Sequence, residues 1–428
     1  MTGYLRRIVA AFEAPGYRYI ASSTFLFGAS WTMDAIVQGW VVLQLTNSPF
    51  WVGAAAGIRG TSQLLFSVAG GTLADRFDRR RLLLGTYVFL AAVAAALGAL
   101  AATGSLALWN MLPLVILGGA IGLMGPSSSA MTYDVVGPER LLNASAFSFL
   151  NGAVVRTITG LLAGIALDRL GIAPSYFVVA ALFLGTGAAL LPLRVPRRAR
   201  EDERRETSLA TLRAGFAYAR RTSAVRTLLA LSAITEVFGF AYLFVLPVLA
   251  RDVLGVSATG LGALTSASAA GQFVAMIALA MTGDVRRKGA LLIWSTLAFG
   301  VAVLTLSLSS AFIISLAIVF AVGAAASLYD TTMWTVVQMT TAPEMRGRVL
   351  GLYMATFGLS QIGGFIVGAA ASVATLPVAL GIAGTLVAAN ALRSFTSIAR
   401  LSPAAEAAPL AASPLEAPPV EVIVRPEA

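Results

Sequence analysis

Long apolar runs recur along this chain, and they constrain its fold more than any other feature. Crossing the hydrocarbon core of a bilayer takes about 20 apolar residues as a helix, and we count about twelve such runs. The mean hydropathy of +0.83 is far above the range of soluble proteins. The runs also lack the alternating pattern of barrel strands. We therefore expect an all-α membrane protein with helices over approximately 18–45, 51–74, 82–103, 107–128, 143–167, 172–193, 226–250, 257–282, 289–308, 311–336, 347–373 and 375–397.

The distribution of lysine and arginine predicts the orientation of these helices. Cytoplasmic loops of membrane proteins carry an excess of both residues. If the N-terminus is inside, the inner segments hold 26 of the 30 basic residues. The outer loops hold only Arg169 and Arg251, and Arg59 and Arg156 fall inside expected helices. We therefore expect both termini in the cytoplasm, and topology explains the net charge of +10 without a nucleic-acid partner.

One long polar interruption divides the helices six and six. Residues 194–225 begin "RVPRRAREDERRE" and continue "TSLATLRAGFAYARRTSAV", which reads as a solvated linker followed by an amphipathic surface helix. The last residues are rich in proline and alanine without a periodic apolar face. The expected division is an N-terminal six-helix half at 1–193, a cytoplasmic linker at 194–225, a C-terminal six-helix half at 226–398 and a disordered cytoplasmic tail at 399–428.

Three sets of residues recur between the halves at offsets between 204 and 209 residues. An aspartate before a basic cluster recurs after the second and eighth expected helices, a Pro-Glu pair recurs in two loops, and a glycine pair recurs in the fifth and eleventh helices. Similar offsets in three places indicate a duplicated six-helix unit, so the halves should be pseudo-symmetric. The matching residues are Asp75 with Asp284, Pro138-Glu139 with Pro343-Glu344, and Gly160 and Gly164 with Gly364 and Gly368.

The composition excludes several kinds of chemistry. The chain has neither cysteine nor histidine, which removes disulfides, thiol catalysis, Cys-ligated metals and the usual group that titrates near neutral pH. No phosphate-binding GxxxxGK[ST] motif is present, so ATP is not the direct energy source. We expect no catalytic residues, no metal and no cofactor, and any proton-linked step must use carboxylates.

Five ionisable residues lie within the expected spans, namely Asp34, Arg59, Arg156, Glu236 and Asp330. A charge at the bilayer centre costs about 2.5–3.5 kcal/mol on insertion scales, so such a residue usually faces a cavity or a partner. These five are the candidates for a substrate or proton pathway. Asp34 and Arg59 lie at similar depth in consecutive antiparallel helices, where they can form either a static couple or part of a working cavity.

The other three candidates each have two interpretations. Glu236 has no basic neighbour on its own helix and is either a proton carrier or a hydrogen-bonding group in helix packing. Asp330 is placed near the cytoplasmic end of its helix, where a salt bridge with Arg346 or Arg348 is the ordinary expectation. Arg156 shares a face with Gly160 and Gly164, which predicts close helix packing with the arginine directed at the interface between the halves.

The segment "GGTLADRFDRRR" at 70–81 concentrates charge between two apolar runs. Arginines there suffice to fix topology, but acidic residues contribute little to orientation, so their presence favours a charged network. The segment resembles the signature between the second and third helices of the major facilitator superfamily. In that family it forms a conformational latch, which here implies Gly71, Asp75, Arg76, Arg79 and Arg80. Asp78 stands where glycine is usual, and the second copy, "TGDVRRKG", is degenerate.

Two further segments, "LPVLARDVLG" at 246–255 and "RGRVLGLY" at 346–353, resemble the enterobactin-exporter-like branch of that superfamily. The resemblance implies the major facilitator fold in a bacterial inner membrane, with helices 1, 4, 7 and 10 lining a central cavity. The three intramembrane acids fall on helices 1, 7 and 10.

The same resemblance implies a secondary active transporter that works by alternating access. We expect a monomer in the lipid bilayer that exports a small amphipathic molecule, such as a siderophore or drug, in exchange for protons. The alternatives are solute uptake by the same fold and a transport-inactive receptor or scaffold. Intramembrane acids on three cavity helices argue against a scaffold, because they would then have no role.

Overall fold

The computed structural model describes residues 10–14, 16–76, 78–193, 209–283, 285 and 287–398. Nearly all of these residues are helical, and no strand occurs among them. A helix satisfies its own backbone hydrogen bonds within one segment, which is what the hydrocarbon core of a bilayer demands. The expected linker residues before α8 and the expected tail at 399–428 lie outside the described residues.

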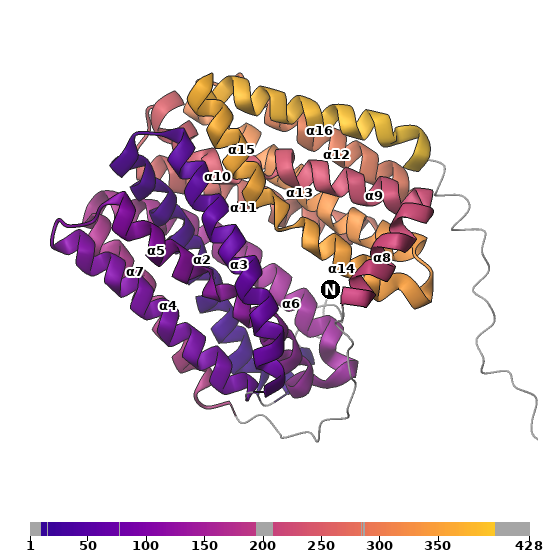
Figure 1. Ribbon diagram of the computed structural model, residues 1–428, viewed down its shortest axis with the longest axis horizontal. Helices are drawn as coiled ribbons and strands as arrows, with labels where there is room; N and C mark the ends of the chain where they lie inside the picture. Colours follow the sequence, from indigo (N-terminus) through magenta and orange to yellow (C-terminus); the bar gives the residue numbers. More distant parts are fainter. Residues whose placement is uncertain are drawn as a thin grey trace, which may run out of the picture.

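The first half of the chain forms six helical spans (Figure 1). The fourth span is composite, because α5 continues through the short 3-10 helix η2 into the beginning of α6. Gly137, with φ +73°, then breaks α6 and separates the fourth span from the fifth. The elements are α2 (Tyr17–Thr46), α3 (Pro49–Arg76), α4 (Arg79–Ala102), α5 (Leu108–Gly118), η2 (Gly119–Met124), α6 (Gly125–Leu170) and α7 (Ile172–Leu190).

The second half repeats this plan after the surface helix α8 (Leu209–Arg221). Its first span contains two π-helical segments, η3 (Thr235–Gly239) and η4 (Leu249–Val253), where the backbone hydrogen-bond pattern widens by one residue. The remaining elements are α9 (Ser223–Ile234), α10 (Ala241–Val248), α11 (Ala258–Thr282), α12 (Lys288–Ser307), α13 (Phe312–Thr340), η5 (Pro343–Met345), α14 (Arg346–Thr356), α15 (Leu359–Val373) and α16 (Leu376–Ile398).

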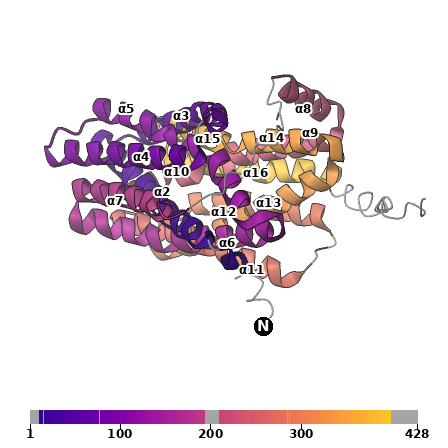
Figure 2. The same ribbon diagram turned by 90° about the horizontal axis from the view of Figure 1, so that it is seen from below.

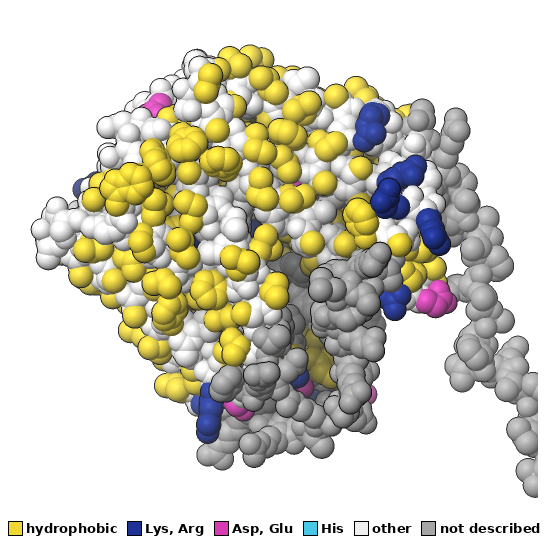
Figure 3. Space-filling model, in the orientation of Figure 1, with side chains coloured by type: hydrophobic (Ala, Val, Ile, Leu, Met, Phe, Trp, Pro, Cys, Tyr) yellow, Lys and Arg dark blue, Asp and Glu magenta, His cyan; other side chains and the backbone are white. Residues whose placement is uncertain are grey.

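Eleven spans among the described residues are long and apolar enough to cross a membrane. The helix α3, which carries Arg59, is not one of the eleven, although it is 28 residues long and packs along α15. Figure 3 shows a surface that is broadly hydrophobic, with charged side chains concentrated near its edges. The chain is therefore the all-α, multi-pass membrane protein that the sequence predicts.

The two halves meet along two helix pairs, α6 with α11 and α3 with α15. Glycines line both contacts and let the backbones approach closely. A Cβ atom added to Gly160 would lie 2.6 Å from Ser266 Oγ, and one added to Gly53 would lie 2.5 Å from the carbonyl oxygen of Gly364. Small residues are the usual solution for tight helix contacts in membranes, because close packing replaces the hydrophobic driving force.

The glycine pairs that recur in the sequence occupy equivalent places in these contacts. Gly160 and Gly164 of α6 pack on α11, while Gly364 and Gly368 of α15 lie against α3 and, for Gly364, also against Phe244. Each copy of the duplicated glycine pair thus lies in one of the two contacts between the halves. This arrangement supports the pseudo-symmetry that we infer from the offsets.

The two ends of the helices differ in charge. We call the end that carries Arg79, Arg80, Arg140 and Arg346 the basic end, and the end that carries Asn47, Asp168 and Arg251 the far end. The N-terminal segment lies at the basic end, because Glu13 forms a 3.1 Å ion pair with Arg140.

The helix α8 occupies the end of the expected linker segment. Figure 2 shows it beside α14 and α9, and its Gly215 lies against Arg348 and Leu352 of α14. Phe216 of α8 is exposed.

Candidate functional site

The N-terminal half contains a buried ion pair between its first two spans. Arg59 Nη2 of α3 lies 2.5 Å from Asp34 Oδ2 of α2, and both side chains are almost completely buried. Counting residues inward from the joint between these helices places both at similar depth, and the two side chains meet in the structure. A charge-assisted pair of this length is among the stronger polar contacts a protein can form.

Neighbouring side chains complete this pair. Arg59 Nη1 donates a 2.6 Å hydrogen bond to Gln38 Oε1, and its guanidinium stacks over Trp31 at 4.7 Å from the ring centroid. Tyr176 of α7 is close enough to interact electrostatically with both charges, and its hydroxyl has no hydrogen-bond partner among the described residues. The arginine is therefore held by three side chains of its own half.

Glu236 lies in the π-helical segment η3, in the middle of the seventh span. The residue is 2% exposed, and its Oε1 atom has no hydrogen-bond partner in the described part of the chain. Such single-turn π-segments are frequent at functional sites, because the extra residue re-aims the side chains of that turn. No pattern in the sequence predicts this π-segment. The orphaned oxygen argues against the packing hydrogen bond that we considered for this residue.

Asp330 of α13 lies near enough to Glu236 for the two carboxyl groups to interact electrostatically. Its Oδ1 atom is buried and has no hydrogen-bond partner among the described residues. The expected salt bridge with Arg346 or Arg348 does not occur in the described residues. The helix α13 continues to Thr340, so Asp330 lies ten residues from its end, roughly 15 Å at 1.5 Å per residue. The expected boundary ended this helix too early and placed Asp330 too close to the basic end.

Two tyrosines border these acids. The hydroxyl groups of Tyr329 and Tyr353 are buried and have no hydrogen-bond partner among the described residues, and both interact electrostatically with Glu236 and Asp330. Nearby, Ser232 and Thr356 share a 2.7 Å hydrogen bond between their hydroxyls. The C-terminal half thus concentrates polar groups whose hydrogen-bonding capacity is unused, whereas the pair in the N-terminal half is nearly satisfied.

Arg156 lies on the face of α6 that meets the C-terminal half. Gly160 and Gly164, one and two turns along, are in contact with α11, as the spacing predicts. The Arg156 side chain, one turn nearer the basic end, is exposed. It interacts electrostatically with Tyr242 and Asp330 across the interface. The sequence-based candidates therefore fall into two groups: Asp34 with Arg59 in the N-terminal half, and Glu236 with Asp330 in the C-terminal half, where Asp330 interacts electrostatically with Arg156 across the interface.

At the basic end, the described part of the expected latch makes contacts within the N-terminal half. Arg79 forms a 2.7 Å ion pair with Asp134 at the end of the fourth span, and Arg80 donates to the carbonyl oxygens of Leu190 and Leu191. Asp78 caps α4 by accepting a 2.9 Å hydrogen bond from the backbone N–H of Arg81. The side chains of Gly71, Asp75 and Arg76 lie outside the described residues.

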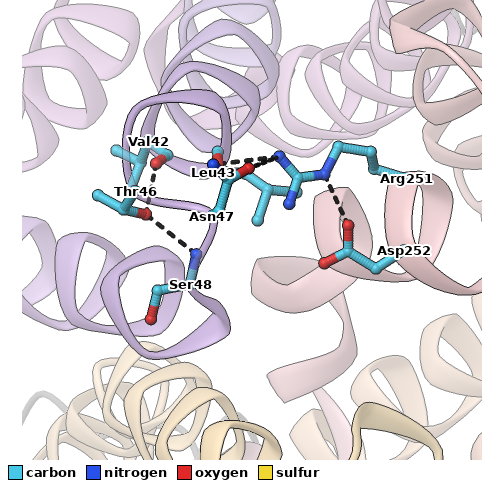
Figure 4. A network of polar contacts seen from close by, with 7 residues as sticks. All are labelled: Val42, Leu43, Thr46, Asn47, Ser48, Arg251 and Asp252. Carbon is cyan, nitrogen blue, oxygen red and sulfur yellow. Dashed lines mark hydrogen bonds and ion pairs between the residues drawn. The ribbon is translucent and has the colours of Figure 1, made fainter.

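At the far end, polar contacts join the halves, and sequence reasoning missed them. Arg251 Nη1 donates hydrogen bonds to Leu43 O at 3.0 Å and to Asn47 Oδ1 at 2.9 Å, at the end of α2 (Figure 4). Its Nε lies 2.6 Å from Asp252 Oδ1. Asn47 adopts a left-handed conformation with φ +47°, which ends α2 and presents both acceptors.

A second contact at the far end uses a helix terminus. Asp168 of α6 accepts hydrogen bonds from Ser257 Oγ at 2.6 Å and from the backbone N–H groups of Ala258 and Thr259 at 3.2 and 2.8 Å. These are unsatisfied donors of the first turn of α11, where a negative charge is also favoured by the helix dipole. The halves are thus joined at the far end by a carboxylate and a guanidinium from opposite halves.

Ionisable side chains within the spans distinguish this site. No group of three or more metal-ligating residues occurs in the described ranges. Carboxyl, guanidinium and phenol groups lie within the spans, where a charge must be paired or face water. The helix pairs that carry the inter-half contacts are the elements that must move if a site between the halves is to open to either side.

Comparisons with known proteins agree with this arrangement. Residues 8–428 match the family described as transmembrane secretion effector. The chain is 26% identical over 349 residues to the enterobactin exporter EntS of Shigella flexneri, covering 80% of this chain and 81% of that protein, and EntS of Escherichia coli O1:K1 / APEC matches equally.

Solved structures share the fold at low sequence identity. A bacterial homologue of the human lysosomal transporter Spinster, in an inward-facing and unoccupied conformation, superimposes with a TM-score of 0.65 at 16% identity and covers 91% of this chain and 97% of its own. A POT family transporter in complex with a thioalcohol-conjugated peptide gives 0.71 at 11% identity, with 90% and 96% covered. The chain belongs to the transmembrane secretion effector family of the major facilitator superfamily, and it is an enterobactin-exporter-like membrane transporter rather than an enzyme.

Proposed function

We propose that this protein exports a small amphipathic molecule across the bacterial inner membrane in exchange for protons. The relatives that are named enterobactin exporters support the outward direction and a substrate of the siderophore or drug-like class. The concentration of basic residues at one end supports an orientation with that end, and both termini, in the cytoplasm. With the far end held shut by Arg251 and Asp168, the described conformation would then face the cytoplasm.

Glu236 carries the proposal of proton coupling. The chain has no histidine, so carboxyl groups are the remaining proton carriers within the spans. Glu236 is buried, has an unpartnered oxygen, and lies near Asp330 and Tyr329 of α13 and Tyr353 of α14. Asp330 in turn interacts electrostatically with Arg156 of α6 across the interface. Intramembrane acids in this kind of setting commonly serve as proton relays. Rocking of the halves would change the access of this group to water on either side.

The test is pH-driven transport in inverted vesicles. Glu236→Gln keeps the shape of the side chain but cannot exchange a proton, so it should abolish pH-driven accumulation while ligand binding persists and loses its pH dependence. Glu344→Gln is the matched control, because Glu344 is exposed at the basic end. Normal pH-dependent transport by Glu236→Gln would move the coupling site to Asp34 or Asp330, or to another ion.

The same vesicles distinguish the alternatives. Accumulation in right-side-out vesicles, and not in inverted ones, would indicate uptake. No flux of any candidate molecule, together with a tail that captures a partner protein, would indicate a receptor or scaffold. We further propose a monomer in the bilayer, which the mass of the protein in nanodiscs tests directly, and we propose no nucleic-acid partner.

A further inference from the structure

Arg156 lies where the two halves separate. It shares one face of α6 with Gly160 and Gly164, and the two glycines are in contact with Ser266 and Ala258 of α11. Arg156 is one turn beyond this contact, toward the basic end, and its side chain is exposed. A Cβ atom added to Gly152, one further turn along, would meet nothing within 4 Å. The contact between α6 and α11 therefore gives way to open space at Arg156.

The guanidinium of Arg156 has little to bind in the described part of the protein. Its Nε donates a 3.3 Å hydrogen bond to Gly152 O of its own helix, and it forms no ion pair with any described carboxylate. Across the interface, the Tyr242 hydroxyl is already hydrogen-bonded to Ser268 at 2.8 Å. Asp330 interacts with Arg156 electrostatically, but it is too far away for an ion pair and keeps an unpartnered Oδ1.

This arrangement differs from the other intramembrane arginine. Arg59 has a carboxylate, an amide oxygen and an aromatic ring as partners. Arginine stays charged in proteins, and its planar donors match carboxylate and similar anions in a bidentate manner. An arginine between two halves, with free donors and an unpartnered acid across from it, has the features of a ligand-binding group rather than of a structural one.

We propose that Arg156 binds an anionic group of the transported molecule, and that Asp330, across the interface, accepts a hydrogen bond from a donor group of the same molecule. The ligand class is then an organic acid that carries a carboxylate, phenolate or sulfonate close to a hydroxyl, amide or ammonium donor. A cation would leave the guanidinium uncompensated, and a neutral molecule would leave its donors less satisfied. A ligand held in this way connects α6 of one half with α13 of the other. The inference rests on the proposed transport function and names its substrate class.

The absence of cysteine allows a direct test of the site. Gly152→Cys introduces a single thiol one turn from Arg156, in open space. The probes are two methanethiosulfonate reagents of similar size, one carrying a sulfonate and the other a trimethylammonium group. We expect the ratio of the anionic to the cationic rate at this thiol to exceed the ratio for a small thiol in solution, and to fall at least about tenfold when Arg156→Gln is added, because a nearby unit charge is weakly screened there. Arg156→Lys should keep most of the preference.

Gly351→Cys at the basic end is the matched control, because its added side chain also meets nothing within 4 Å. Arg156→Gln should leave the rate ratio at that position unchanged. A ratio of anionic to cationic rate no higher than that of a small thiol in solution, a ratio that Arg156→Gln leaves unchanged, or no reaction at position 152 would each overturn the anion site. Labelling does not depend on transport, so failure here leaves proton-coupled export standing, and failure of the Glu236→Gln test leaves the labelling result intact.

Discussion

Replacing Arg251 by glutamine should open the far end of the transporter. The substitution removes two hydrogen bonds from the guanidinium to the end of α2, at 3.0 and 2.9 Å. Hydrogen bonds to a charged group contribute about 1.5–3 kcal/mol each when shielded. The Arg251 side chain is 26% exposed, and solvent screening reduces these values, so we expect about 2 kcal/mol for the two together. At 1.4 kcal/mol per factor of ten, the ratio of open to closed far ends should rise roughly 30-fold.

Pulsed electron–electron resonance between two spin labels measures this ratio, because the chain has no cysteine of its own. Leu45→Cys and Val373→Cys place exposed labels at the far ends of α2 and α15, in opposite halves. Ser105→Ala is the control, since the Ser105 hydroxyl bonds to Thr103 within one half at the same end. An unchanged distance distribution in Arg251→Gln, or an equal shift in Ser105→Ala, would refute the role of Arg251 in holding the halves together.

Two further experiments test the remaining charge clusters. Asp34→Asn or Arg59→Gln alone should strand a buried partner and cost roughly 3–5 kcal/mol, whereas the double variant should cost much less; thermal stability in detergent measures the cycle, and additive losses would exclude an interaction. Recovered stability without recovered transport would make the pair part of the working cavity. Asp75→Asn should slow transport at unchanged amounts of folded protein, and equal rates at equal expression would leave topology as the only role of that segment.

Sequence alone determines the helices and the contacts between helices that follow each other in the chain. Helical spans can be predicted from the sequence because every backbone group in the bilayer must form its hydrogen bonds within its own segment. Each span therefore appears as an apolar run of sufficient length. Asp34 and Arg59 were predictable for a related reason. Their helices are joined by a two-residue connection and run antiparallel, so similar distances from the joint mean similar depth.

Tertiary structure decides everything that depends on how the two halves meet. Arg251 contacts residues more than 200 positions earlier in the chain, and Asp168 caps a helix about 90 positions later. Such contacts depend on the rotation of each helix about its axis, which packing against several neighbours sets and no local pattern encodes. The sequence showed only that Arg251 is one of two basic residues in the expected outer loops, and not which residues it contacts.

The error at Asp330 has the same origin. Composition places the end of a span only to within several residues, and the continuation of α13 to Thr340 moved Asp330 deeper than expected. The π-helical turn around Glu236 likewise has no sequence signature, because it is one residue of extra backbone accommodated by neighbouring helices. The sequence determined which charged groups enter the membrane, because the free-energy cost of a charge there makes such residues rare in apolar runs and easy to identify. The packing of the two halves decided which of them found partners and which, like Arg156 and Glu236, kept their hydrogen-bonding groups free.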